Sequence, residues 1–171
     1  MGRYNVQLKG GDLRSIGKVD QVVAQIRDQA DLDELFNGLF SDDRKVVMRT
    51  ADAIEKVTLK HPVYLRKHKE EIIAICNRAN AIELKWHLAQ LLPRLDLTAR
   101  EAEKCWQILS TWAIDRNESR IVRVNSVQGL FELSERMKKG RSDFDKLMDR
   151  IEKEKIPSIN ARIRKLRRTT R

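Results

Sequence analysis

The chain has 171 residues, of which 35% are charged and 41% hydrophobic, and its net charge is +10. This length suffices for one hydrophobic core, and no stretch approaches the ~18 consecutive apolar residues that span a bilayer. The start lacks the apolar segment of a secretory signal, so we expect a cytoplasmic protein in which Cys76 and Cys105 are buried thiols. Because C-x-x-C and H-x-x-x-H spacings are absent, we expect neither a metal nor a cofactor.

In chain order, residues 1–12 are expected to form a flexible leader, followed by an amphipathic helix over about 13–28. Helix pairs follow, the last of them shorter. Their expected bounds are 31–39 with 44–59, 65–78 with 80–93, 98–114 with 118–136, and 142–155 with a last helix that starts at Pro157. Thr98 and Glu101 have the spacing of a capping box, and Pro157 suits the first turn of a helix. No segment alternates with period two, so we expect no sheet.

A nine-residue pattern recurs at intervals of 38 residues, at Val46–Ile54, Leu84–Leu92 and Val122–Leu130. A fixed period of this length is typical of stacked helical repeats. Positions one, five, eight and nine of the pattern hold mostly apolar or small residues and predict a buried stripe. Positions three, four and seven are therefore expected to lie on the opposite side of each helix.

These segments resemble the second helix of HEAT repeats, whose signature is V-R-x-x-A-A-x-A-L after an Asp-containing turn. The resemblance covers about residues 30–136 clearly and 141–170 weakly. It implies an all-α fold, a right-handed α-solenoid of about four HEAT-like helix pairs with an extra N-terminal helix. The repeat domain would span 13–160, and 161–171 would be the Arg-rich end of the last helix.

The family's ladder of Asp–Arg pairs between repeats is expected to be incomplete, because the residues at its two positions vary. The basic position holds Val47, Lys85 and Arg123, and the acidic turn position holds Asp42, Asn80 and Glu118.

The resemblance also implies that the second helices line a concave groove. The candidate binding residues are those opposite the stripe and two flanking cations: Met48, Arg49, Asp52, Lys85, Trp86, His87, Gln90, Arg123, Asn125 and Gln128. Aromatic and arginine side chains anchor protein interfaces, so the leading hypothesis is a non-catalytic scaffold that binds a protein partner. In the alternative, Met48, Trp86 and Val124 merely pack between stacked helices and the polar residues are solvated.

The second hypothesis is nucleic-acid binding by the C-terminal end. Residues 161–171 carry six positive charges and no acid, which leaves a net charge of +4 on the rest of the chain. The basic residues are Arg162, Arg164, Lys165, Arg167, Arg168 and Arg171. Such a cluster binds phosphate backbones, docks on an acidic protein or keeps a terminus soluble. Because it contains no aromatic residue, stacking on single-stranded bases is not expected.

A third hypothesis is an enzyme. Some DNA glycosylases are built of HEAT-like repeats, and Trp86, Trp106, Trp112 and Asp115 invite comparison with their nucleotide pockets. However, Trp106 and Trp112 have core-like spacing, and no nucleophile has a convincing base beside it. We therefore expect a protein that is not an enzyme.

Overall fold

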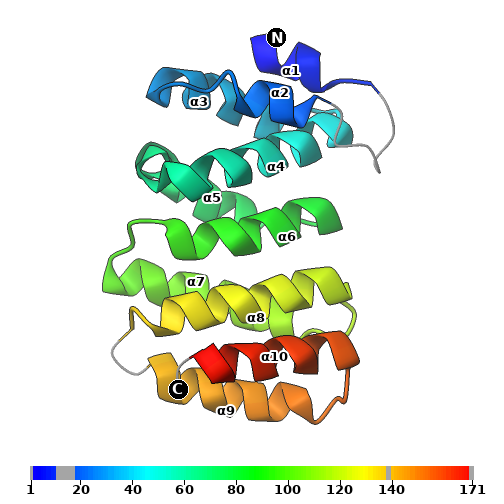
Figure 1. The fold of residues 1–171 in the computed structure, drawn as a ribbon, viewed down its shortest axis with the longest axis vertical. Helices are drawn as coiled ribbons and strands as arrows, with labels where there is room; N and C mark the ends of the chain where they lie inside the picture. Colours follow the sequence, from blue (N-terminus) through cyan, green and yellow to red (C-terminus); the bar gives the residue numbers. More distant parts are fainter. Residues whose placement is uncertain (1, 11–17, 138–139, 170–171) are drawn as a thin grey trace. The chain divides into compact units, whose positions relative to one another are not determined.

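The computed structural model describes residues 2–10, 18–137 and 140–169 (Figure 1). Every regular element in these ranges is a helix, which confirms the all-α class. Each described helix is too short or too polar to cross a bilayer. The chain divides into two compact units, Met1–Lys69 and Glu70–Arg171, which are considered separately below.

The first unit is built around one long helix, α4, which contacts most of the other elements of the unit. The elements are α1 (Arg3–Leu8), α2 (Val19–Val23), α3 (Gln29–Phe36), η1 (Asn37–Phe40), α4 (Arg44–Lys60) and η2 (Pro62–His68). The side chain of Asp28 caps α3 by accepting a hydrogen bond from the Asp31 amide, and Asp43 caps α4 in the same way through Lys45. The expected helix over 13–28 is observed only at Val19–Val23, and residues 13–17 lie outside the described ranges.

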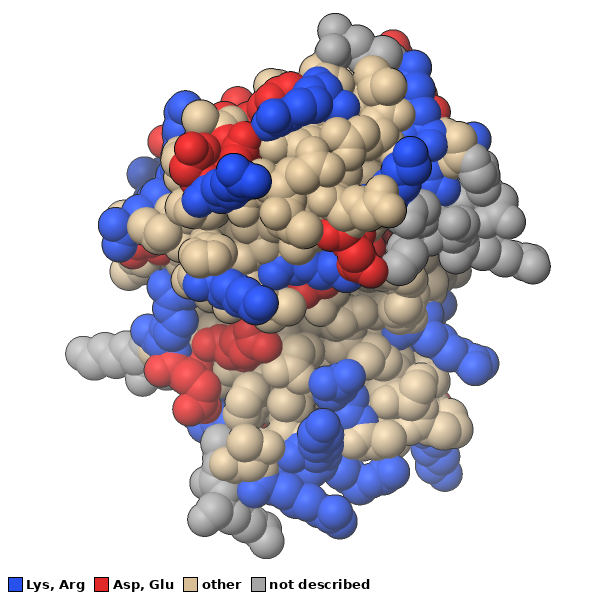
Figure 2. All heavy atoms as spheres, turned by 45° about the horizontal axis from the view of Figure 1, so that its top comes forward, with Lys and Arg blue, Asp and Glu red and all other residues tan. Residues whose placement is uncertain are grey.

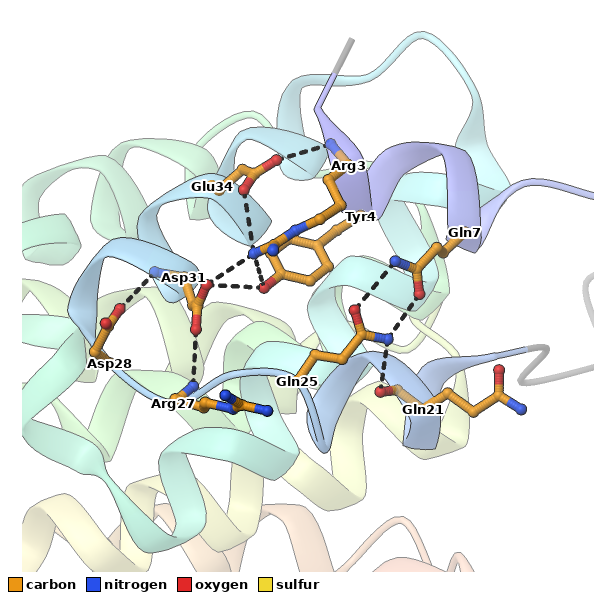
Figure 3. Close-up of polar contacts among 9 residues, drawn as sticks. All are labelled: Arg3, Tyr4, Gln7, Gln21, Gln25, Arg27, Asp28, Asp31 and Glu34. Carbon is orange, nitrogen blue, oxygen red and sulfur yellow. Dashed lines mark hydrogen bonds and ion pairs between the residues drawn. The ribbon is translucent and has the colours of Figure 1, made fainter.

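The expectation of a flexible leader is wrong for residues 3–8, because they form α1 and bury Tyr4 and Leu8 completely. Figure 3 shows how polar groups hold this helix. The Arg3 guanidinium lies 2.8 Å from the Asp31 carboxylate, and the Tyr4 hydroxyl donates to the same carboxylate at 3.1 Å. The side-chain amides of Gln7 and Gln25 donate to each other at 3.2 and 3.0 Å.

The second unit contains the remaining helices. They are α5 (Lys69–Cys76), which begins one residue before the unit boundary, α6 (Ile82–Leu91), η3 (Leu92–Arg94), α7 (Ala99–Ile114), α8 (Arg120–Ser134), α9 (Gly140–Glu152) and α10 (Pro157–Thr169). Thr98 and Glu101 form the expected capping box, and Pro157 begins α10. Helix α8 is central, because it contacts α6, α7, α9 and α10. In Figure 1, α6, α8 and α10 lie side by side, with α7 and α9 in a layer behind them.

The repeated stripe forms the core of the second unit. Its apolar residues on α6, η3 and α8 are buried: Leu84, Leu88, Leu91, Leu92, Val122 and Leu130. At Gly129, a Cβ atom would lie 2.7 Å from the carbonyl oxygen of Ala89, so only glycine allows α8 to approach α6 this closely. Close helix packing therefore explains why this position of the pattern holds glycine.

Two ion pairs form a ladder between successive helix pairs in the second unit. Lys85 on α6 pairs with Glu118, which lies in the turn between α7 and α8. Arg123 on α8 lies 2.9 Å from Glu154, in the turn between α9 and α10, and its Nε donates to the Ala113 carbonyl at 2.9 Å. The second unit thus contains an ion-pair ladder. Lys85 and Glu118 take part in it, although the HEAT signature has arginine and aspartate at these two positions.

Candidate functional site

In the first unit, the predicted groove residues are largely internal. Met48 and Arg49 are buried, and Arg49 donates to the carbonyl oxygens of Leu8 and Gly10 at 2.7 and 2.5 Å. The expectation that these two side chains point outward is therefore wrong. Asp52 is partly exposed and lies 3.3 Å from Lys56, one helical turn away.

In the second unit, three more predicted groove residues have structural contacts. His87 and Arg123 are buried. Lys85 pairs with Glu118, and its ammonium also lies 5.8 Å from the ring centre of Trp112, so it is held on two sides. The outward orientation expected for His87 is wrong, because His87 is shielded from solvent. Arg123, expected to flank the groove, is also buried and donates its hydrogen bonds to Ala113 and Glu154 inside the fold.

Besides Asp52 and Lys85, four predicted groove residues keep partial exposure, namely Trp86, Gln90, Asn125 and Gln128. The Trp86 ring meets the ring of His87 edge-on, with centres 5.1 Å apart. Gln128 donates to Glu132 at 2.8 Å and accepts from Arg162 at 2.9 Å. These residues form a partly exposed surface on α6 and α8. That this surface binds a partner stays a prediction.

An exposed basic surface lies on α10. Its inner stripe, Ile159, Ile163 and Leu166, is buried, at helical spacings of four and three. The opposite side of a helix fixed in this way must face solvent. Five of the six basic residues expected in this part of the chain lie on α10, and their angular position around the helix decides which of them face solvent. The sixth, Arg171, lies outside the described residues.

Two basic residues of α10 hold the helix in place. Arg162 donates to Gln128 of α8. Arg167 contacts three carboxylates of α9, with nitrogen–oxygen distances of 2.6 Å to Asp149, 2.6 Å to Glu152 and 3.6 Å to Asp145. Partial burial opposes the charged form of Arg167, but the hydrogen bond to Asp149 and the neighbouring carboxylates outweigh it and raise the pKa of this guanidinium.

The other three, Arg164, Lys165 and Arg168, are exposed and form what we call the basic face of α10. Together with Ala161 and Thr169 they line a shallow surface hollow. Their side chains make no hydrogen bond or ion pair with another described residue. In Figure 2, lysine and arginine side chains gather over this helix at the lower end of the view. The basic face is therefore a charged surface without an acidic partner in the described structure.

A second, mostly apolar hollow lies along α7. It is lined by Trp106, Gln107, Ser110, Thr111, Ile114 and Asp115. Trp112 does not line it and is only 7% exposed. Of the residues that invite comparison with a nucleotide pocket, the structure therefore brings Trp106 and Asp115 to one surface and places Trp112 in the core.

The two cysteines are free and buried, as expected. Burial raises the pKa of the Cys105 thiol to about 11 and also raises the pKa of Cys76. Both groups are thus held as thiols at neutral pH, which makes them poor nucleophiles.

No family model, curated protein or solved structure matches this chain. The surfaces described above are therefore the basis for assigning a function.

Proposed function

We propose that this protein is a HEAT-like helical-repeat module that binds nucleic acid through the basic face of α10. The 38-residue period and the ion-pair ladder of the second unit support a repeat fold, for which we propose the right-handed solenoid arrangement. The observation that carries the function is the set of three exposed cations, Arg164, Lys165 and Arg168, which have no described partner.

Charge chemistry favours a phosphate ligand for this face. Arg164 and Arg168 are one helical turn apart, about 6 Å along the axis, so the three cations act on one short stretch of ligand. Guanidinium groups bind phosphate oxygens in a bidentate manner, and two of the three cations are arginines. Neutralising phosphates releases condensed counterions, which drives association at low salt.

A binding role rather than a catalytic one is supported by the state of the nucleophiles and bases. Both cysteine thiols are buried with raised pKa values. His68 and His87 are also buried. Both cysteines and two of the three histidines are thus withdrawn from solvent, whereas the basic face is open.

The test is a salt-titrated binding assay on a triple variant in which Arg164, Lys165 and Arg168 become Gln. Affinity for duplex DNA should fall at low salt, and the slope of log K against log salt should become shallower by about 2.7, since each lost phosphate contact contributes about 0.9. A matched control changes three exposed cations elsewhere in the same unit, Arg78, Arg100 and Lys104, to Gln. Equal loss in both variants, or none in the first, contradicts the proposal.

A second candidate function is protein binding by the half-buried residues of α6 and α8. The observation in its favour is the partial exposure of Trp86, since tryptophan is a frequent anchor of protein interfaces. A photo-crosslinking amino acid at Gln90 should give a discrete protein adduct in cells, and Trp86→Ala should abolish it. Adducts that persist unchanged in Trp86→Ala rule out this surface as the anchor.

A further inference from the structure

We infer that the ligand of the basic face is double-stranded nucleic acid, bound through its phosphate backbone without reading base sequence. This inference rests on the proposed function and narrows it to one class of ligand. It follows from what the basic face contains, how α10 is held, and how little of the helix protrudes.

The chemistry of the basic face disfavours single strands. Surfaces that bind single-stranded DNA or RNA combine positive charge with aromatic side chains on which bases stack. The hollow on α10 offers only Ala161 and Thr169 beside its three cations. A single strand would therefore gain electrostatic attraction here and nothing from its bases.

The fixed position of α10 favours a stiff ligand. Three apolar side chains, Ile159, Ile163 and Leu166, bury one side of the helix. Arg162 ties it to α8, and Arg167 ties it to three carboxylates of α9. Its cations are thus a preformed array, and a preformed array binds a rigid rod without the ordering cost that a flexible chain must meet. Duplex DNA is stiff over about 150 base pairs.

The density of phosphate charge also favours a duplex over a single strand. A duplex carries about one phosphate charge per 1.7 Å of axis, twice the density of one of its strands. Three cations confined to about 6 Å of helix therefore meet more phosphates on a duplex than on a strand.

The packing of α10 explains why base edges are not read. A recognition helix enters the major groove because it protrudes from the protein. Helix α10 packs against both α8 and α9, so only the strip that carries Arg164, Lys165 and Arg168 is open. Such a strip reaches backbone phosphates, which position a protein on the duplex but carry no sequence information.

An anionic membrane surface is disfavoured for a similar reason. Interfacial helices bury a free apolar side in the lipid. The apolar side of α10 is already buried in the protein, and its exposed hollow contains only alanine and threonine besides the cations.

The experiment measures fluorescence anisotropy of the full chain with four labelled probes at several salt concentrations. They are two 20-base-pair duplexes of unrelated sequence and one single strand from each, with phosphatidylserine vesicles tested in parallel by sedimentation. We expect the duplexes to agree within about twofold, to bind at least about fivefold more tightly than the strands, and to give a slope near −2.7, as three phosphate contacts require.

The outcomes separate the inference from the function on which it rests. Strands that bind as tightly as duplexes, or duplexes that differ more than about tenfold, overturn the inference and leave nucleic-acid binding in place. Failure of all four probes overturns both, and vesicle binding in that case identifies the face as a lipid surface. The variant Arg164→Lys with Arg168→Lys retains charge and should keep the duplex preference, whereas substitution of both by Gln should remove it.

Discussion

The guanidinium of Arg123 lies 2.9 Å from the carboxylate of Glu154, and the two side chains are only 2% and 12% exposed. This pair joins α8 to the turn that precedes α10, across 31 residues of sequence. The pair helps to position the basic face, because this turn determines where α10 begins.

Arg123→Met should destabilise the protein by about 3 kcal/mol, since it leaves the Glu154 carboxylate without its main partner in a largely buried site. The double variant Arg123→Met with Glu154→Met should recover part of this loss, because no uncompensated charge then remains. Urea denaturation followed by circular dichroism measures both values. Equal stability of Arg123→Met and the parent protein would contradict a structural role for the pair.

We expect Arg167 to affect duplex binding indirectly, because its ion pairs hold α10 in position. Arg167→Gln removes its ion pairs with Asp145, Asp149 and Glu152 and loosens the end of the helix that carries Arg168. We expect weaker duplex binding with a smaller preference for duplex over single strand, because the array is no longer rigid. Arg167→Lys should restore part of that preference, whereas a residue that only contacted phosphate would change both affinities in the same ratio.

The N-terminal helix should contribute to stability, contrary to the expectation of a flexible leader. Tyr4→Ala should cost about 3 kcal/mol, because Tyr4 is fully buried and its hydroxyl donates to Asp31. Val6→Ala is the matched control, since Val6 is 60% exposed on the same helix. Trypsin cleavage after Arg3 should also accelerate in Tyr4→Ala. Cleavage at the same high rate in both proteins would mean that α1 is not held.

The stability of the first unit should depend on pH through Asp33. Burial would raise the pKa of this carboxyl group, but hydrogen bonds from Lys67, Gln29 and His68 outweigh burial and lower it from 3.8 to about 2. Because the folded-state pKa lies below the unfolded value, the carboxylate stabilises the fold above pH 4 and loses this effect as pH falls towards 2.

The difference in unfolding free energy between the parent protein and Asp33→Asn should therefore be about 2 kcal/mol near pH 6 and should shrink between pH 4 and 2. Urea titrations at four pH values measure it. A difference that stays constant down to pH 2 would show that the charge of Asp33 does not contribute.

Much of the helical architecture could be predicted because it depends on neighbours in the sequence. The stripe of α8 and the capping box of Thr98 and Glu101 follow from spacings of three and four residues, which are local properties of a helix. Helix α1 was missed, although Tyr4 and Leu8 have such a spacing, because six residues are too few for a periodic pattern to stand out.

The candidate groove was harder to predict than the helices, because the angular position of a polar residue around its helix does not determine whether its side chain is buried. Arg49 was expected to face outward, yet its guanidinium donates to carbonyl oxygens of residues about 40 positions earlier. A long side chain can turn to a buried acceptor on another element, and spacing within its own helix carries no sign of that acceptor.

By itself, the sequence determined the all-helical class, the 38-residue period, the buried stripe and the position of the basic end, since these depend on residues within one or two helical turns. The tertiary structure alone decided which cations are available to a ligand. Arg162 and Arg167 are held by residues of α8 and α9, whereas Arg164, Lys165 and Arg168 face solvent. The physical reason is that an ion pair or hydrogen bond needs only proximity in space, and folding brings its partners together from distant parts of the chain.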